Sequence, residues 1–264
     1  MDGTADAGAD GGARESAHAV FSVIEAAPAY RLVFHAIERE ILEGRLRIGD
    51  RLPTETELAQ RLGVHRSTTR EGLRLLEQSG LAERREGRRL YASLPRTDDL
   101  SERAQRALSL SRVSFDGLWR LLRALEPAAA ALAAERIDPE TVRALEVNLA
   151  QTAEAVTAGR SVTQLDLEFH ALIAEATGDA AWRLAREPSA ALLFPANERM
   201  LPRLAQSGAR LLTAHRSIFD AVRAGDGVGA ERWMRRHIDD FRRGYVLAGF
   251  DPDEPVSPVG APAN

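Results

Sequence analysis

The sequence of 264 residues contains no cysteine, which excludes a disulfide framework and removes any reason to expect an oxidising compartment. It has no apolar run approaching about 18 residues, so we expect no membrane span. The N-terminus is rich in Asp, Gly and Ala and has no basic segment, which argues against a signal peptide. Lysine is also absent, which is typical of a genomic composition bias rather than of a function. These absences predict a cytoplasmic protein.

The charge of this chain is distributed unevenly. Its length is sufficient for two domains, and 44% hydrophobic with 28% charged residues is ordinary for a globular protein. The net charge of −4 argues against nonspecific nucleic-acid binding by the whole chain. Residues 29–95, however, carry 13 Arg against 10 Asp and Glu, a charge of +3, which leaves −7 for the remainder. A basic N-terminal module on an acidic body favours DNA binding at one end only.

Two short helices joined by a tight turn are predicted between residues 52 and 80. Thr54 and Glu57 have the spacing of a capping box, so the first helix should start just after Pro53. Gly63 suits a turn that requires a positive φ. Thr68 and Glu71 offer a second capping box for the second helix, and Gly80 should end it.

The second helix has the composition of a DNA-reading helix. Arg66, Ser67 and Arg70 fall at or near its start, the end that enters a major groove in helix-turn-helix proteins. Arginine can grip guanine or a phosphate with two hydrogen bonds. The alternative is an ordinary helical hairpin whose arginines are solvated, because two-helix patterns are common.

The flanking segments favour the DNA-binding interpretation. An amphipathic helix is predicted from Tyr30 to Glu43, and residues 81–91 predict two short strands around a Glu-Gly turn. The expected apolar side of this helix is formed by Leu32, Ile37, Ile41 and Leu42. Three helices followed by a hairpin wing would complete a small DNA-binding domain.

Residues 29–93 resemble the winged helix of the GntR family of bacterial transcription regulators. The residues that match are Gly49-Asp50-Arg51-Leu52-Pro53-Thr54-Glu55, Leu58-Ala59, Leu62-Gly63-Val64, Arg66, Arg70-Glu71, Leu76 and Gly80. The resemblance implies DNA contacts by His65, Arg66, Ser67, Thr68 and Arg70, with Gly87 at the wing tip.

The match departs from the family at two positions. Thr56 stands where many members have Arg, so we expect one phosphate or base contact to be missing. His65 stands where Ser or Thr is usual, which is expected to alter the base preference.

The rest of the chain is predicted to be helical, which makes the fold mainly α. We expect a disordered segment over 1–24, a winged helix-turn-helix over 25–95, a linker over 96–112, a helical effector and dimerisation domain over 113–250 and a flexible tail over 251–264. Helices are predicted over 114–136, 138–159, 162–177, 180–187, 190–205, 208–224 and 227–248. The result is an all-helical bundle of six or seven helices.

Four residues of this bundle have the chemistry of a metal site. Asp166 and His170 are four residues apart on one helix face, and His215 and His237 lie on the last two helices. One carboxylate and three neutral imidazoles can hold a divalent first-row metal. A single histidine on a helix is, by contrast, usually a surface residue or a core residue with its hydrogen bonds satisfied.

Residues 114–248 resemble the FCD effector domain of the FadR-type GntR regulators. The matching runs are Arg123-Ala124-Leu125-Glu126 with Ala128, Ala129 and Leu132-Ala133-Ala134; Asp166-Leu167-Glu168-Phe169-His170; and His215-Arg216-Ser217-Ile218 with Ala221, Asp226 and His237. Family members with this Asp, His, His, His set bind a divalent metal, so the resemblance implies one here. We expect Zn²⁺, with Ni²⁺ and Mn²⁺ as alternatives, because imidazole suits all three. Asp179 stands where Asn is common, which affects a helix cap rather than this site.

The expected effector is a small organic acid. A divalent cation with one carboxylate and three neutral histidines leaves a charge of +1, which favours an anion with oxygen donors. Arg123 is the candidate second clamp for its carboxylate. The alternative is a solvated Arg123 or an ion pair with Glu126 or Asp116. The family's typical effectors, small organic acids, agree with the first interpretation.

The sequence therefore predicts a homodimeric transcription regulator, a repressor that leaves an inverted-repeat operator in double-stranded DNA when a small carboxylate binds beside the metal. One alternative keeps the regulator but makes the metal purely structural. A second is a metal-dependent hydrolase fused to a DNA-binding domain, which requires a general base near the metal. Glu168 is nearby, but it should point to another side of the helix from Asp166, so no base is evident and no enzyme is expected.

Overall fold

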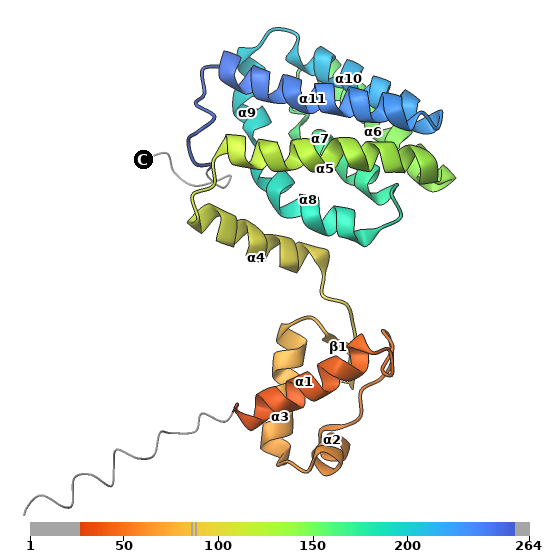
Figure 1. The fold of residues 1–264 in the computed structure, drawn as a ribbon, viewed down its shortest axis with the longest axis vertical. Helices are drawn as coiled ribbons and strands as arrows, with labels where there is room; N and C mark the ends of the chain where they lie inside the picture. Colours follow the sequence, from red (N-terminus) through yellow and green to blue (C-terminus); the bar gives the residue numbers. More distant parts are fainter. Residues whose placement is uncertain (1–26, 86, 88, 257–264) are drawn as a thin grey trace, which may run out of the picture. The chain divides into compact units, whose positions relative to one another are not determined.

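The computed structural model describes residues 27–85, 87 and 89–256. The chain divides into two compact units, Met1–Pro95 and Arg96–Asn264 (Figure 1). The disorder expected over residues 1–24 falls outside the described residues, as does the end of the expected tail. Across the described part of the chain, no helix is long and apolar enough to cross a membrane.

The first unit contains the expected three helices and hairpin. Its elements are α1 (Ala29–Leu42), α2 (Glu55–Leu62), α3 (Arg66–Gln78), β1 (Ala82–Arg85) and β2 (Arg89–Ala92). The capping box that opens α2 is confirmed, because Thr54 Oγ1 accepts from the Glu57 amide and Glu57 Oε2 accepts from the Thr54 amide. Gly63 follows α2 with a φ of 66°, as the turn requires.

The predicted second capping box is wrong. Helix α3 begins at Arg66, with His65 at the N-cap position and no side-chain cap, so Thr68 and Glu71 already lie inside it. The cause is the shortness of the turn, since Val64 donates to the Ala59 carbonyl and the new helix starts two residues later. Arg66 and Ser67 consequently occupy its first turn.

The strands pair antiparallel, with Ala82 opposite Ala92 and Arg85 opposite Arg89 around the turn that contains Gly87. The buried residues of this unit form one apolar cluster: Val33, Ile37, Leu52, Leu58, Leu73, Leu76, Ala82 and Ala92. The expected apolar side of α1 is partly wrong, because Leu32 and Leu42 are exposed and Val33 is buried in their place. Helix α1 thus packs through a face rotated by one position from the predicted one.

The described residues of the second unit form helices joined by short connections. They are α4 (Thr97–Leu110), α5 (Phe115–Arg136), α6 (Pro139–Thr157), α7 (Thr163–Glu175), α8 (Ala180–Leu193), α9 (Ala196–Met200), the 3₁₀ turn η1 (Leu201–Arg203), α10 (Ser207–Arg223) and α11 (Gly227–Leu247). Ser114 caps α5 and Asp138 caps α6, as their sequences predict. Helix α5 lies between α11 and α8 (Figure 1).

Three segments of this unit differ from expectation. The expected linker is helix α4, which packs on α8 and accepts a hydrogen bond at Thr97 from Arg183. A break between two helices was expected near residue 188, but in the described structure α8 continues through Pro188 to Leu193. Residues 252–256 are paired with the start of α5, since carbonyls at 252 and 254 accept from the amides of residues 116 and 115. These carbonyls satisfy amides that a helix start leaves without partners.

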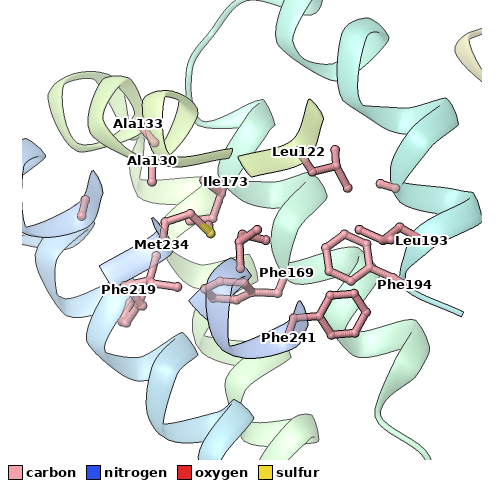
Figure 2. Packing of buried hydrophobic residues seen from close by; sticks show 14 of the residues in the cluster. Leu122, Ala130, Ala133, Phe169, Ile173, Leu193, Phe194, Phe219, Met234 and Phe241 are labelled. Atoms are coloured by element: carbon pink, nitrogen blue, oxygen red, sulfur yellow. The ribbon is translucent and has the colours of Figure 1, made fainter. Parts of the chain in front are cut away.

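The core of the second unit surrounds α7. Figure 2 shows Phe169 and Ile173 of α7 among Leu122 of α5, Phe194 and Met234. His170, which follows Phe169 on α7, is buried in the same core, at 0% exposed.

Candidate DNA-binding surface and metal centre

The residues expected to contact DNA lie on the exposed side of α3 and at the wing. Arg66, Ser67 and Arg70 are exposed on α3, and His65 is exposed directly before it. Thr68 is half-buried in the first turn. Gly87 is exposed in the turn between β1 and β2 with a φ of 71°, a conformation that favours glycine. The structure thus displays two arginines on an exposed helix start, where groove-reading side chains lie.

One of these arginines has a partner that the sequence pattern did not indicate. Arg70 Nη2 and Nε lie 3.1 and 3.2 Å from Glu55 Oε2, although the Arg70 side chain remains 62% exposed. Glu55 is the first residue of α2, so the pair joins the two helices of the motif. Any ligand that contacts the Arg70 guanidinium would therefore either displace Glu55 from it or meet it in the orientation that Glu55 holds.

The four predicted metal ligands converge inside the second unit. Asp166 and His170 come from α7, His215 from α10 and His237 from α11, and all four are buried. Each offers one ligand atom, and these atoms lie within 4.8 Å of one another. Asp166 Oδ1 is 3.0 Å from His215 Nε2, 3.7 Å from His170 Nε2 and 3.9 Å from His237 Nε2. Residues up to 71 positions apart in sequence thus form one cluster.

The polar atoms of this cluster are better placed to bind a cation than to form hydrogen bonds with one another. Asp166 Oδ1 and His215 Nε2 are close in distance but do not align as a hydrogen bond, and neither atom has another hydrogen-bond partner within the described ranges. His170 Nε2 and His237 Nε2 face each other at 3.2 Å, and two imidazole lone pairs repel unless a proton or a cation lies between them. Orphaned buried acceptors pointing at a common centre are typical of metal ligands. The cluster can therefore hold a metal ion.

The acid–base state of the cluster also suits a metal. Burial lowers the pKa of His215, and burial together with His215 and His170 holds the pKa of His237 well below its usual value. Burial alone would raise the pKa of Asp166, but the three imidazoles beside it outweigh burial and lower that pKa to about 2. Asp166 is thus ready to coordinate as a carboxylate, and His215 and His237 as neutral imidazoles, which are the protonation states that coordination requires.

A second layer of buried groups orients His170. Its Nδ1 lies 3.0 Å from Glu126 Oε2, and Arg186 Nε donates to Glu126 Oε1 at 2.8 Å. Burial raises the pKa of a carboxyl group, but Arg186 and His170 outweigh burial and hold the pKa of Glu126 at about 2. A carboxylate on Nδ1 fixes the histidine tautomer that leaves Nε2 free for a metal. One signal of this layer is present in the sequence, because Arg186 precedes Ser189 and Ala190 by three and four residues and so shares their helix face, which is buried.

Other neighbours complete the surroundings. Asn197 Nδ2 of α9 donates to Asp166 Oδ2 at 2.7 Å, and Phe169 stacks on the His215 ring at a centroid distance of 3.8 Å. Glu168, which lies near Asp166 in the sequence, accepts a hydrogen bond from Asn148 Nδ2. The neighbours thus hold the proposed metal ligands in place, and Glu168 is not positioned to act on the cluster as a general base.

A cavity of about 160 Å³ opens beside the cluster. Its polar lining consists of Asp166, His237, Asn197, Ser207, Arg210, Asp240 and Arg243, and its apolar lining includes Met200, Leu204 and Phe241. Asp240 lies 2.7 Å from Arg243 Nη1 and 3.7 Å from Arg210 Nη2. Two arginines and two aspartates, Asp166 among them, balance each other in the lining, so a divalent cation at the cluster would make the site positive and favour an anionic ligand.

The structure places Arg123 away from this cavity. Its Nε and Nη2 lie 2.6 and 3.3 Å from the two carboxylate oxygens of Asp239, and Trp119 lies beneath its guanidinium. Arg123 does not line the cavity, whereas Arg210 and Arg243 do. An ion pair of Arg123 with Glu126 or Asp116 was the alternative expected from the sequence, but its partner is Asp239 of α11.

Comparison with known proteins agrees with both units. The family described as "Bacterial regulatory proteins, gntR family" matches residues 29–91, and the FCD domain matches residues 118–240. LutR, an HTH-type transcriptional regulator of Bacillus subtilis, is 29% identical over 214 residues, which cover 80% of this chain and 97% of LutR. Mce2R, an HTH-type transcriptional regulator of Mycobacterium tuberculosis, is 30% identical over 219 residues, which cover 76% of this chain and 84% of Mce2R.

A solved structure shows the same architecture. The GntR protein of Streptococcus agalactiae superposes with a TM-score of 0.56 at 28% sequence identity, over 81% of this chain and 99% of that protein. The match therefore includes both the winged helix and the helical bundle. The relatives are transcription regulators, and this chain matches most of the length of each. It therefore belongs to the GntR family, carries an FCD domain, and is a DNA-binding transcription regulator rather than an enzyme.

Proposed function

We propose that the operator affinity of this regulator is set by a small carboxylate that binds next to a divalent metal held by Asp166, His170, His215 and His237. The observation that carries the proposal is the convergence of four buried ligand atoms within 4.8 Å, at the edge of a cavity that Asp166 and His237 also line. When bound, the metal supplies a positive centre for an oxygen ligand. Zn²⁺ is the first expectation, with Ni²⁺ or Mn²⁺ as alternatives.

The cavity wall supports an acid as the effector. Arg210 and Arg243 line it together with two of the metal ligands, Asp166 and His237, so a carboxylate there would be able to meet both a guanidinium and the metal. An effector changes DNA binding only by favouring one arrangement of the paired winged helices over another. We propose that it favours release, which makes the protein a repressor.

The metal is tested by elemental analysis of protein purified without a His-tag. Near-stoichiometric metal is expected in the wild type and loss of it in a His215→Ala, His237→Ala double variant. Metal content that stays unchanged in the double variant would place the ion elsewhere. The fold of that variant is checked by circular dichroism, so that loss of metal is not confused with unfolding.

The effector is tested with a panel of small mono- and dicarboxylates scored by melting shift. Hits are then tested for operator binding, where an allosteric coupling of about 1–3 kcal/mol would change affinity by about 5- to 150-fold. Arg210→Ala should lose the response while still binding the operator, and Arg123→Ala serves as the matched arginine variant outside the cavity. If no acid changes operator affinity, the metal is structural and the sensor proposal fails.

We further propose that the DNA contacts are made by His65, Arg66, Ser67, Thr68 and Arg70, with Gly87 at the wing tip, on the chromosome in the cytoplasm. One winged helix contacts too few bases to select a site in a genome, which supports a homodimer on an inverted repeat. Light scattering should give a dimer at operator-binding concentrations. A monomer, with and without DNA, would contradict this.

A further inference from the structure

Residues 250–256 form a strap that leads from the end of α11 to the start of α5. Gly249 turns the chain away from α11 with a φ of 85°, a conformation that favours glycine. Asp251 makes the next turn, because its backbone and side-chain oxygens accept hydrogen bonds from two amides that follow it. The matched FCD region covers residues 118–240, so the strap lies outside it.

One end of the strap is held by the wall of the cavity. The guanidinium carbons of Arg199 and Arg203 lie 4.5 and 4.4 Å from the centroid of the Phe250 ring, which also stacks on Tyr245. Arg203 Nη1 donates to the Ala248 carbonyl at 3.0 Å, just before the strap begins. Arg199 belongs to α9 and Arg203 to η1, and both elements line the cavity. The position of Phe250 therefore depends on the positions of α9 and η1.

Helix α9 also supports a metal ligand. Asn197 Nδ2 donates to Asp166 Oδ2 at 2.7 Å, two residues before Arg199. Helix α9 has only five residues, so it depends on such contacts more than on its own backbone hydrogen bonds. Asp166 is fixed when the cluster is occupied, and through Asn197 the short helix is fixed with it.

The other end of the strap covers the start of α5. Two strap carbonyls accept from the amides of Phe115 and Asp116, at 3.3 and 2.8 Å. The Val256 amide donates to the Val113 carbonyl at 2.9 Å, which extends the pairing to the residues before the helix. The first amides of a helix have no acceptor within it, so the strap supplies what the helix lacks. This junction joins α5 to α4, the helix that follows the end of the DNA-binding unit at residue 95.

We infer that the strap couples occupancy of the metal cluster to the junction between α4 and α5. The inference rests on the metal part of the proposed function. In the metal-free protein, local opening of α9 releases Phe250, and the strap carbonyls then leave the first amides of α5. When the cluster is occupied, Asp166 and Asn197 hold α9, Phe250 stays between its two arginines, and the junction opens less often.

Amide hydrogen exchange of the full chain, stripped of metal and then supplied with Zn²⁺, tests this coupling. The reference is the start of α6, where the Asp138 side chain, rather than the strap, accepts from the amides of Glu140 and Thr141. Exchange through a local opening slows when that opening becomes rarer. We expect Zn²⁺ to slow exchange of the Phe115 and Asp116 amides by at least about tenfold, against less than about twofold at the α6 start.

Three variants localise the coupling. Phe250→Ala removes the ring that α9 and η1 hold, and Asp251→Ala removes a side-chain acceptor from an exposed turn of the strap. In both, at wild-type metal content, the Zn²⁺ response of the α5 start should fall to that of the α6 start. Val246→Ala shortens an exposed apolar side chain on the last turn of α11 and should keep the wild-type response. If Phe250→Ala does not fold, Asp251→Ala decides alone.

An equal effect of Zn²⁺ on the two helix starts, in wild-type protein that holds the metal, would overturn the inference and leave the metal site standing. A response that persists in either strap variant would overturn the role of the strap. Wild-type protein that binds no Zn²⁺ would overturn the proposed function, and the inference with it.

Discussion

The two units of this regulator place their charged groups in opposite ways. In the described part of the DNA-binding unit, the buried polar residues are Thr69 and Ser93, and neither is charged. The effector unit buries Glu126, Asp166 and Arg186, along with three histidines. One unit has an apolar interior and a charged exterior, while the other builds its functional site from charges inside the core.

This difference determines how each site can be altered. An exposed arginine on α3 makes no packing contacts that the fold requires, so DNA affinity and stability can change independently there. A buried group of the effector unit is held by other buried groups, and removing one leaves its partner charged and without compensation. Function and stability should therefore be separable in the first unit and coupled in the second.

The largest effect that tests this contrast is expected at Arg186. Arg186→Met removes the guanidinium from Glu126 and should lower the free energy of unfolding by about 3–5 kcal/mol, because the carboxylate remains buried. Urea denaturation followed by tryptophan fluorescence reports on this unit, since the three tryptophans, Trp119, Trp182 and Trp233, all lie in it. Arg183→Met is the matched control on the same helix, because Arg183 is exposed, and should change stability by about 0.5 kcal/mol or less. Equal effects of the two substitutions would contradict the buried-charge argument.

Removal of the metal should have the next largest effect. A ligand present at about 100 times its dissociation constant stabilises the folded state by about 2.7 kcal/mol, so a strong chelator should lower the melting temperature of the effector unit. The His215→Ala, His237→Ala variant should not respond to chelator. A chelator response that is the same in both proteins would show that the ion contributes nothing at this cluster.

A comparable loss of DNA affinity, without loss of stability, is expected in the other unit. Arg66→Ala and Arg70→Ala should each weaken operator binding by about 1–3 kcal/mol if the arginine makes a bidentate base contact. Arg39→Ala is the control for general loss of positive charge, because Arg39 is exposed on α1. Gel-shift titration measures the affinity, and wild-type binding by both α3 variants would refute their role. A melting temperature that falls with affinity would instead break the contrast between the units.

A substitution at Glu55 tests the role of Arg70 in DNA binding without altering Arg70 itself. Because Arg70 lies against Glu55 in the free protein, Glu55→Gln releases a charged partner without changing side-chain size. If Glu55 competes with DNA, the variant should bind the operator more tightly. If Glu55 orients Arg70 for the groove, the variant should bind less tightly, and either shift should disappear in an Arg70→Ala background. An unchanged affinity would show that the pair has no part in DNA binding.

Local patterns in the sequence predicted much of both units. Helix starts at Thr54, Ser114 and Asp138 follow from capping residues that act within three positions. The Asp166 and His170 pair lies on one turn of one helix, and His215 and His237 were candidates because they lie on the last two predicted helices, a set that the family resemblance then supported. What the sequence did not indicate are contacts that depend on how helices pack, since side-chain partners far apart in sequence leave no local periodicity.

The missed contacts show this in particular. Arg123 lies 116 positions from Asp239, and Arg186 lies 60 positions from Glu126. Neither pairing follows from helical spacing, because the partners are brought together only when α5 packs between α8 and α11. The Asn197 contact with Asp166, across 31 positions, depends in the same way on the place of the short helix α9.

The smallest expected effect distinguishes two sequence patterns that look the same. Thr54 with Glu57 and Thr68 with Glu71 both have capping-box spacing, but only the first forms the reciprocal hydrogen bonds. Thr54→Ala should destabilise α2 by about 1 kcal/mol, because the Glu57 amide loses its acceptor at a helix start. Thr68→Ala should leave stability unchanged or slightly raised, since alanine favours a helix interior, while operator binding falls modestly with the loss of a phosphate contact. Hydrogen exchange of the α2 and α3 amides in the full chain measures each helix separately. Equal destabilisation by both substitutions would mean that α3 starts at Thr68 after all, and Arg66 and Ser67 would then lie in the turn rather than on the helix that reads DNA.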